Sequence, residues 1–257
     1  MTENIAEHGV AEKKVAVISG GTSGIGRAIA TRLAEKGHFV VAFGNDAFQA
    51  EQTSAALASR GLCVDILEAD VSNTDDIAGV VKKAVSNYGK IDYLCNCAGI
   101  RPVGTILETE EETWDLVMQV NLKGMFLLTK AVIPHMIRNG GGAIVNISST
   151  SGFAGKSHFA YSVSKGAIAT FTRSLAIDYV DHNIRVNTVV PGFIQTGMTQ
   201  NWPDEAIQRI AQKSLLKRAG VPEDIAGTVL FLLSDEALTI TGTTIEVGTL
   251  PGSVPGR

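Results

Sequence analysis

Short apolar runs alternate with longer segments of helical periodicity along nearly the whole chain. The apolar runs predict strands at residues 14–19, 39–43, 63–68, 91–97, 143–147, 185–190 and 244–247. The segments between them predict helices at residues 27–36, 47–60, 74–88, 111–139, 160–181, 204–213 and 222–233. Because nearly continuous apolar strands alternate with helices, we expect a single doubly wound α/β domain with a parallel sheet of about seven strands.

Composition narrows the class of protein. The chain has 257 residues, of which 45% are hydrophobic, and no linker or repeat divides it. Its net charge of −4 comes without a basic stripe, so nucleic acid is not expected as a partner. No apolar run approaches the roughly 20 residues of a membrane span and no signal peptide opens the chain, so we expect a cytoplasmic protein without membrane contact. Residues 1–12 are polar and predict a flexible tail ahead of the domain at 13–257.

The cysteines are too few for a disulfide framework. The chain has three of them, which fits a reducing cytoplasm. Cys95 and Cys97 lie on one predicted strand, with no further Cys or His at ligand spacing. We therefore expect two buried thiols and no metal site.

A glycine-rich turn joins the first predicted strand to the first predicted helix. Its spacing, G-x-x-x-G-x-G, suits a tight turn that approaches a pyrophosphate closely at a helix N-terminus. It lacks the Gly-Lys-Ser/Thr ending of nucleotide triphosphatases. The alternative is a glycine-rich turn without a ligand. The candidate dinucleotide-binding residues of this turn are Gly20, Ser23, Gly24, Ile25 and Gly26.

Further candidate residues follow the third, fourth and sixth predicted strands, whose carboxyl ends meet at one edge of the sheet. Asp70 is placed to accept from an adenine amino group, or equally to cap the next helix. Thr196 is placed to hold a carboxamide, although its Pro-Gly start is also ordinary turn chemistry. The candidate cofactor-binding residues at this edge are Asp70, Val71, Asn96, Ala98, Gly99, Pro191, Gly192, Ile194 and Thr196.

Tyr161 and Lys165 stand four residues apart at the start of a predicted helix and therefore share one face. A lysine ammonium beside a phenol favours the phenolate, so we expect the pKa of Tyr161 to be lowered. A tyrosine tuned in this way can transfer a proton to or from an alcohol near neutral pH. In isolation, such a pair also arises by chance on solvated helix faces.

Together these motifs resemble the short-chain dehydrogenase/reductase family, including its 3-oxoacyl-reductase-like and alcohol-dehydrogenase-like members. The matching elements follow the family's order over about residues 13–250: Gly20-x3-Gly24-x-Gly26, Asp70, Asn96-x-Ala98-Gly99, Asn121, Ser149, Tyr161-x3-Lys165 and Pro191-Gly192 with Thr196. The resemblance implies a Rossmann-type domain that binds NAD(P) and interconverts a secondary alcohol and a ketone by hydride transfer.

The resemblance also implies a role for each of four catalytic residues. Tyr161 is expected to be the general acid/base. Lys165 is expected to lower its pKa and to hold the nicotinamide ribose hydroxyls. Ser149 is expected to polarise the substrate oxygen, and Asn121 to kink its helix and hold a water of the proton relay.

Three departures from the family's pattern stand out. Ser148 has the usual spacing to the tyrosine, but Ser149 has the usual S-x-x-G context through Gly152, so Ser149 is preferred. Cys97 replaces the second Asn of Asn-Asn-Ala-Gly. Residues 247–251 replace the usual Val-Asp-Gly-Gly, which leaves the contribution of the tail to the site open.

The end of the second predicted strand bears on the choice between NAD(H) and NADP(H). An acid there binds the ribose hydroxyls, whereas an arginine binds the 2′-phosphate. The position falls on Gly44, followed by Asn45 and Asp46, and no Lys or Arg occurs between residues 38 and 59. Ser23 replaces the basic residue that many NADP-binding members carry. These residues favour NAD(H), although Asn45 is a neutral donor that can also hold the phosphate.

The substrate site is the least specified part of the sequence. Residues 197–213 are expected to form a lid over the site. Arg101 and His158 are candidates to face the cleft and bind a carboxylate or phosphate, although solvated positions are commoner for single residues of this kind. The candidates for an apolar inner face of the lid, for each of which packing on the domain is the commoner use, are Met198, Trp202 and Ile207.

The resemblance leaves three candidate functions and implies one oligomeric state. Members acting on acyl-carrier proteins usually have arginines where this chain has Gly140 and His182, which favours a small free alcohol or ketone such as a polyol, hydroxy acid or cyclic alcohol. The alternatives are an NADPH-dependent 3-oxoacyl-[acyl-carrier-protein] reductase and a non-catalytic protein that senses the dinucleotide. A homotetramer is expected, assembled through the two long helices at 111–139 and 160–181.

Overall fold

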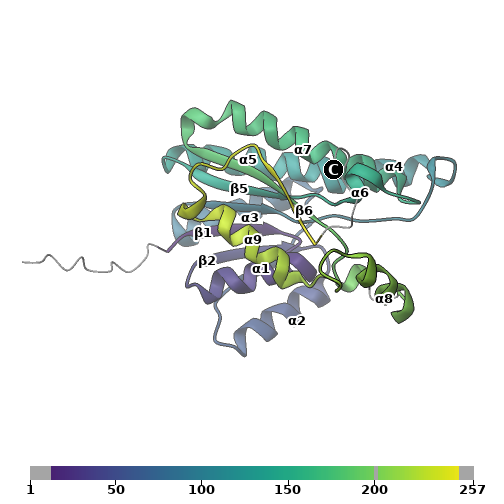
Figure 1. Ribbon diagram of the computed structural model, residues 1–257. Helices are drawn as coiled ribbons and strands as arrows, with labels where there is room; N and C mark the ends of the chain where they lie inside the picture. The colour runs from purple at the N-terminus through teal and green to yellow at the C-terminus, as the bar shows by residue number, and fades with distance from the viewer. Residues whose placement is uncertain (1–12, 200–201, 249–257) are drawn as a thin grey trace, which may run out of the picture.

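The computed structural model describes residues 13–199 and 202–248, which form a single parallel sheet with helices on both faces (Figure 1). The seven strands lie in the order β3-β2-β1-β4-β5-β6-β7. This confirms the doubly wound α/β fold. The predicted tail at 1–12 lies outside the described residues. The strands are β1 (Val15–Ser19), β2 (Phe39–Gly44), β3 (Asp65–Glu68), β4 (Tyr93–Asn96), β5 (Gly142–Ile147), β6 (Ile184–Pro191) and β7 (Thr244–Val247).

Helices cover the two faces of the sheet in two groups. On one face α1 (Gly24–Glu35) packs beside α9 (Pro222–Leu233). The other face carries α3 (Thr74–Tyr88), α5 (Gly124–Arg138) and α7 (Phe159–Asp178). The other helices and helical turns are α2 (Ala47–Ala58), α4 (Glu111–Met118), α6 (Ser151–Ala154), α8 (Asp204–Lys213), η1 (Ile106–Glu108), η2 (Gln119–Lys123), η3 (Val180–His182), η4 (Gly197–Thr199) and η5 (Asp235–Ala237).

Both faces of the central strands are buried, which explains why their sequences are continuously apolar. In β1, Ile18 belongs to the same cluster as Ile29 of α1 and Val229 of α9. Its neighbour Val17 points to the opposite face, into the cluster that contains Leu128 of α5. Successive side chains of a strand alternate between faces, so a strand covered on both sides is apolar at every position.

A buried polar row crosses the carboxyl half of the sheet. It consists of Asn96 of β4, Asn146 of β5, Thr188 of β6 and Thr172 of α7. Asn96 Nδ2 donates to Asn146 Oδ1 at 2.8 Å, and Asn146 Nδ2 donates to Thr172 Oγ1 at 2.9 Å. Thr188 Oγ1 donates to Thr172 Oγ1 at 2.7 Å. Hydrogen bonding within the row removes most of the penalty of burying these groups.

The predicted helix at 111–139 is divided by a turn of π-helix. The turn is η2, which carries Asn121 between α4 and α5. The combined stretch Glu111–Arg138 is long and apolar enough to cross a membrane by length and composition alone. Several of its apolar side chains, including Leu128, Val132 and Met136, are buried against the sheet. The core helix of a soluble protein can pass the same test.

Candidate active site

The glycine-rich turn lies where two strands end side by side. Ser19 Oγ at the end of β1 accepts from Cys97 N at 3.1 Å, so the turn and the chain after β4 are held together. Gly20 has φ +64°, and a Cβ placed there would lie 2.9 Å from Ala98 N. A Cβ on Gly26 would lie 2.2 Å from Gly20 O. Side chains at these two glycines are therefore excluded by backbone.

The N-terminus of α1 faces the segment that follows β6. Gly24 has φ +49°, and a Cβ there would lie 3.4 Å from Thr196 Cγ2. Ser23, the N-cap of α1, makes no side-chain capping hydrogen bond. Free N–H groups at a helix start, reached through glycines, are the arrangement that binds pyrophosphate in dinucleotide sites. The turn and the predicted carboxamide-binding Thr196 are thus brought together, and they fit a dinucleotide.

Asp70 is not the cap of the following helix. The N-cap of α3 is Asn73, whose side chain accepts from Asp75 N at 2.9 Å. Asp70 Oδ1 instead accepts from Ser72 N at 2.8 Å, which shapes the turn after β3. The capping alternative is therefore wrong. Beside it, Val71 is buried against Gly124 at the start of α5, where a Cβ would meet it at 2.8 Å.

The end of β2 has no room for an acidic side chain. A Cβ on Gly44 already lies 2.3 Å from Thr22 Oγ1 in the glycine-rich turn. The nearest acid, Asp46, is the N-cap of α2 and accepts from the backbone N and the side-chain Nε2 of Gln49, each at 3.0 Å. The exposed Asn45 stands between them. Because its carboxylate is engaged at the helix start, Asp46 gives little reason to prefer NAD(H).

Tyr161 and Lys165 lie buried on the first turns of α7. They are 7% and 5% exposed, and Lys165 Nζ is 5.9 Å from the centre of the Tyr161 ring. Lys165 Nζ donates to Ile147 O at the end of β5, at 2.8 Å. Burial lowers the pKa of Lys165 to about 8, because a buried ammonium is poorly solvated. The lysine is thus fixed between strand and helix, with its charge close to the phenol.

The expected lowering of the Tyr161 pKa is wrong for this structure. Burial raises the pKa of Tyr161 above its ordinary value and outweighs every opposing effect. A hydrogen bond with Ser149 and the charge of Arg101 both act to lower that pKa, but less strongly. Burial disfavours a phenolate for the same reason that it disfavours the Lys165 ammonium. The sequence showed the ion-stabilising neighbour but not the depth at which the phenol lies.

Of the two neighbouring serines, Ser149 is the one whose hydroxyl reaches Tyr161. Ser148 Oγ is buried and donates to Lys165 O at 2.7 Å, so it anchors the backbone of α7 instead. The S-x-x-G context has a steric reason: a Cβ on Gly152 would lie 2.7 Å from Gly166 N. Glycine at this position lets the chain after Ser149 lie directly against α7.

Asn121 is buried in the π-helical turn and holds the chain that follows β4. Its Oδ1 accepts from Ile100 N at 2.8 Å, and its Nδ2 donates to Ile100 O at 3.0 Å. Nδ2 also donates to Ser164 Oγ at 3.0 Å. A Cβ on Gly99 would lie 3.2 Å from Asn121 Oδ1 and 3.4 Å from Lys165 Nζ. The chain after β4 is therefore packed between Asn121 and the lysine.

A small cavity of about 10 Å³ lies under this cluster. Asn96 Oδ1, an atom of the polar row, is buried without a hydrogen-bond partner among the described residues. Asn146, the partner of Asn96 on β5, was not among the residues expected from the sequence. A polar residue within the apolar run 143–147 was the signal that could have revealed it. The cavity is lined by Ser19, Val71, Asn96, Ala98, Val120, Asn121, Met125, Ile147, Lys165 and Ile168.

Two thiols lie on β4 and directly after it. Cys95 is buried and Cys97 half-buried, and burial raises the pKa of Cys97 to about 11. Across residues 13–199 and 202–248, no group of three His, Cys, Asp or Glu side chains could hold a metal ion. Cys95 belongs to the hydrophobic core, and Cys97 packs against that core beside the glycine-rich turn.

Helix α8 belongs to the segment expected to form a lid, and it stands apart from the sheet (Figure 1). Trp202 packs on Phe193 with ring centres 5.3 Å apart, and the Arg101 guanidinium lies 5.5 Å from the Trp202 ring. Met198 is 50% exposed. Of the three apolar candidates in the lid, Trp202 is thus the one seen to contact the chain after β4. Residues 200 and 201 lie outside the described residues.

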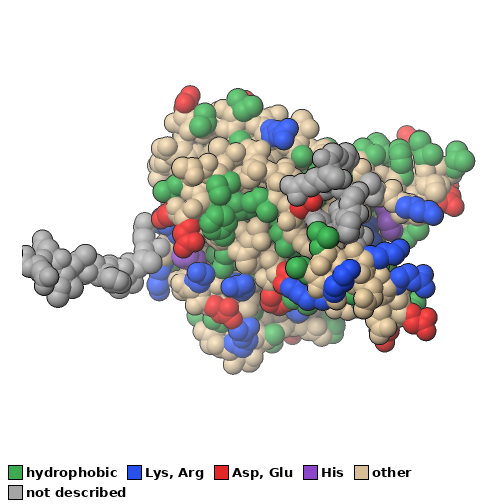
Figure 2. All heavy atoms as spheres, in the orientation of Figure 1, with side chains coloured by type: hydrophobic (Ala, Val, Ile, Leu, Met, Phe, Trp, Pro, Cys, Tyr) green, Lys and Arg blue, Asp and Glu red, His purple; other side chains and the backbone are tan. Residues whose placement is uncertain are grey.

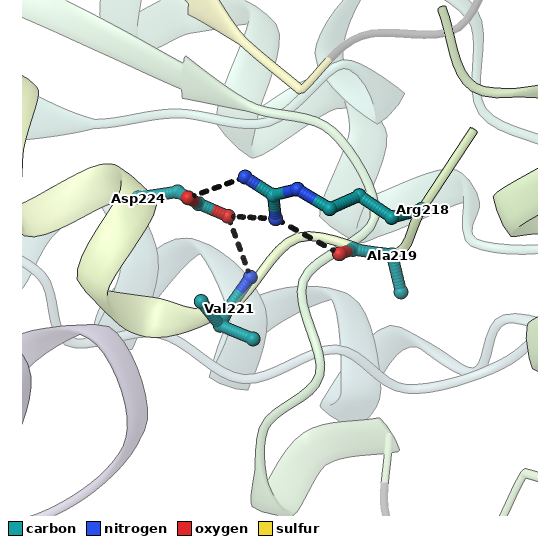
Figure 3. Close-up of polar contacts among 4 residues, drawn as sticks. All are labelled: Arg218, Ala219, Val221 and Asp224. Atoms are coloured by element: carbon teal, nitrogen blue, oxygen red, sulfur yellow. Dashed lines mark hydrogen bonds and ion pairs between the residues drawn. The ribbon is translucent and has the colours of Figure 1, made fainter. Parts of the chain in front are cut away.

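An ion pair between Arg218 and Asp224, called the clamp below, joins the segment after α8 to the start of α9 (Figure 3). Arg218 donates to both carboxylate oxygens of Asp224, at 2.6 and 2.7 Å. The same carboxylate accepts from Val221 N at 2.9 Å, which starts α9. Just before α9, Gly220 N donates to Phe193 O at 3.0 Å, so this segment pairs with the chain after β6.

The sequence matches a known protein family over most of its length. Residues 20–249 match the family described as Enoyl-(Acyl carrier protein) reductase. The 3-oxoacyl-[acyl-carrier-protein] reductase FabG of Thermotoga maritima is 40% identical over 239 residues, 92% of this chain and 96% of that protein. Dehydrogenase/reductase SDR family member 4 of Homo sapiens is 40% identical over 248 residues, 95% of this chain and 88% of that protein. The chain belongs to the short-chain dehydrogenase/reductase family.

A solved structure of a short-chain dehydrogenase/reductase relative agrees with this assignment. The crystal structure of a single-substitution variant of the actinorhodin polyketide ketoreductase with NADPH superposes with a TM-score of 0.86 at 32% identity, covering 91% of this chain and 95% of that one. As a member of the family, the chain is an NAD(P)-dependent oxidoreductase. The preference for NAD(H) expected from its sequence gains no support from a relative that holds NADPH.

Proposed function

We propose that the protein interconverts a secondary alcohol and a ketone on a small free substrate, with Tyr161 transferring the proton. The observation that carries the proposal is the meeting of Tyr161 with both Ser149 and Lys165 at the carboxyl edge of the sheet. The hydride at the substrate carbon would be supplied or accepted by a dinucleotide held at this edge. In the direction of reduction, the substrate oxygen gains the proton of the Tyr161 hydroxyl.

Each catalytic side chain has a task that its contacts support. Ser149, which shares a hydrogen bond with Tyr161, would donate to the substrate oxygen and orient it toward the phenol. Lys165 would stabilise the phenolate formed by proton transfer, because its ammonium is held close by Ile147 O. Asn121 would keep the neighbouring chain at Ile100 in place.

A water site beneath Lys165 fits the expected proton relay. The cavity of about 10 Å³ is close to the volume that one water needs. Polar groups of Asn121 and Lys165 line it, together with the unpartnered Asn96 Oδ1. We therefore assign to this cavity the water that returns protons from solvent to Tyr161.

The dinucleotide would lie along the carboxyl edge, with its pyrophosphate at the start of α1. We propose that it is held by Gly20, Ser23, Gly24, Ile25, Gly26, Asn45, Asp70, Val71, Asn96, Ala98, Gly99, Tyr161, Lys165, Pro191, Gly192, Ile194 and Thr196. Separate calorimetric titrations with NADH and NADPH measure the preference. Because Asp46 is occupied as a helix cap, Asn45 and Ser23 would be the groups beside a 2′-phosphate.

A 3-oxoacyl-[acyl-carrier-protein] reductase is the second candidate. Gly140 lies in a tight turn and His182 is exposed, so neither supplies a fixed cation. However, Lys and Arg side chains gather at the end of the molecule that carries α8 (Figure 2), and the exposed ones include Arg209, Lys213 and Lys217. Such a surface would attract an acidic carrier protein. Much faster reduction of a 3-oxoacyl group on its carrier protein than of a free 3-oxo ester would favour this candidate.

We also propose a cytoplasmic homotetramer assembled through the two long helical segments. Large apolar side chains remain exposed on α4, α5 and α7, including Leu116, Phe126 and Ile177. Exposed apolar side chains grouped on helices are typical of subunit interfaces. The free thiols of Cys63, Cys95 and Cys97 fit a reducing compartment. Sedimentation of the purified protein measures the assembly.

The proposed function is tested by removing the hydroxyl oxygen of Tyr161. Tyr161→Phe should lower turnover about 10²- to 10⁴-fold, since the general acid/base is lost, while dinucleotide binding by calorimetry stays largely unchanged. The matched control is Tyr179→Phe, which makes the same change at the other end of α7 and should retain full turnover. Equal turnover in the Tyr161 variant would overturn the mechanism.

A further inference from the structure

Arg101 has an unusually fixed backbone for a residue in a connecting segment. On one side, Ile100 is held through both of its backbone groups by Asn121, at 2.8 and 3.0 Å. On the other side, the Nδ1–H of His158 donates to Pro102 O at 3.0 Å. Both anchors come from elements that flank the Tyr161 site. The Arg101 Cα is therefore placed by the catalytic scaffold and not by the lid.

The guanidinium of Arg101 contacts an aromatic ring and has one nitrogen without a hydrogen-bond partner. Its Cζ atom lies 5.5 Å from the centre of the Trp202 ring, in a cation–π contact. Its Nε atom is buried and has no hydrogen-bond partner, and no ion pair of Arg101 occurs within residues 13–199 and 202–248. A buried donor without a partner is costly, so this nitrogen is suited to receive an acceptor from a ligand.

The charge of Arg101 also reaches the reacting group. It acts to lower the pKa of Tyr161, which burial raises overall. Two observations independent of this effect place it beside the site: its neighbour Ile100 is bound by Asn121, and Gly99 lies against Lys165. A ligand group held by the guanidinium would thus lie near the carbonyl being reduced.

We propose that Arg101 and Trp202 form a carboxylate subsite, and that the substrate is a keto acid or its hydroxy acid, with the carboxylate a few bonds from the reacting carbon. The inference rests on the proposed function and narrows its substrate class. A planar guanidinium matches the two oxygens of a carboxylate, and the Trp202 ring lies beside this one. The single charge of Arg101 balances a monoanion.

The test compares acids with their neutral esters. The substrates are 3-oxobutanoate, 4-oxopentanoate and the methyl ester of each, with the tighter-binding dinucleotide as cosubstrate. The wild type should favour at least one acid over its ester. Arg101→Gln should lower kcat/KM for that acid about tenfold to a hundredfold more than for its ester, since the effect of the charge on Tyr161 is common to both substrates. Arg101→Lys keeps the charge without the planar edge and should recover only part of the loss.

A control variant separates the subsite from general electrostatics. Arg173→Gln removes the same charge from an exposed position of α7, twelve residues beyond Tyr161, and should leave the ratio of acid to ester unchanged. A wild type that reduces the esters as well as the acids would overturn the subsite but leave the proposed function standing. So would an Arg101→Gln variant that loses acid and ester activity in equal proportion.

A binding measurement makes the inference independent of turnover. The chain has two tryptophans, so Trp114→Phe leaves Trp202 as the reporter in the lid. In the presence of dinucleotide, 4-oxopentanoate should change Trp202 emission in a saturable way, whereas its methyl ester should not. Arg101→Gln should abolish the change. Binding of the acid without turnover of any ketone would sink the proposed function and keep the subsite; no binding of either acid would sink the subsite.

Discussion

The two walls of the candidate site are held in very different ways. The wall formed by β5 and α7 is buried, and Lys165 is tied to it by its ammonium while Ser148 ties its carbonyl. The proposed opposite wall is the segment expected to form a lid, whose helix α8 contains no buried residue. The described contacts of this segment include those of Trp202 and a hydrogen bond from Thr199 Oγ1 to Ile194 O, and the clamp between Arg218 and Asp224 follows it. The proposed proton-transfer groups are therefore preorganised, whereas we expect that the segment proposed to face the substrate can change without disturbing them.

The largest expected effect is the loss of turnover when the Lys165 ammonium is removed from the buried wall. Lys165→Met keeps a similar length but removes the ammonium, so we expect turnover to fall about 10²- to 10⁴-fold. Steady-state kinetics at saturating dinucleotide measures the loss. Lys213→Met on α8 makes the same change on the exposed wall and should alter turnover little. A Lys165 variant with turnover close to that of the wild type would show that the buried wall is not the catalytic one.

A second change weakens the polar row behind that wall. Asn146→Val removes two buried hydrogen bonds, so that Asn96 Nδ2 keeps only Thr129 as acceptor and Thr172 Oγ1 keeps only Thr188 as donor. We expect the free energy of unfolding to fall by about 1–3 kcal/mol, as for the loss of other buried hydrogen bonds. Denaturant unfolding measures the change. No loss of stability would mean that buried water replaces the amide.

The same wall should show a pH dependence that the lid lacks. Burial lowers the pKa of Lys165 to about 8 from 10.5, so the folded protein holds this proton more weakly than the unfolded chain does. The penalty is full below about pH 8 and is relieved as the pH rises towards 10.5. The stability of the wild type relative to Lys165→Met should therefore increase across that window, as measured by unfolding at each pH. A constant difference would contradict a buried ammonium.

The smallest effect concerns the clamp of the lid. Arg218→Met removes an exposed pair, and exposed pairs contribute little to global stability, so the melting temperature should stay within about 2 °C. The clamp fixes the chain that follows the proposed lid, so its loss should weaken substrate binding. We therefore expect KM for substrate to rise with kcat nearly unchanged. Asp224→Asn should act alike, and the double variant should add nothing further. An equal fall in kcat would show that the lid also positions the catalytic groups.

The fold was largely predictable from the sequence, because strands buried on both faces have an apolar residue at every position. The predicted strands and helices occur in the observed order, and β7 and α3 have the predicted bounds. The glycine-rich turn and the Tyr161–Lys165 pair were recognisable because their spacing is local. Long-range contacts were not: the Asn96–Asn146 pair joins residues on separate strands.

Burial itself explains the main error at the site. Tyr161 has an acidifying neighbour in sequence, but its solvation depends on the whole fold, and burial raises its pKa. The capping of α2 by Asp46 has a local signal in the sequence, since Gln49 follows three residues later. The anchoring of Ile100 by Asn121 had no local signal, because the two meet only after β4 and η2 are placed.

The π-helical turn also sets the phase of everything that follows it. Residues 119–123 contain one more residue per turn than an α-helix would, so α5 is rotated relative to α4 by about 100° compared with an uninterrupted helix. Deleting one residue there would restore a continuous helix, and it would swing either Asn121 away from Ile100 or the buried face of α5 away from the sheet. The rotation of α5 and the position of the Asn121 amide therefore depend on the same inserted residue.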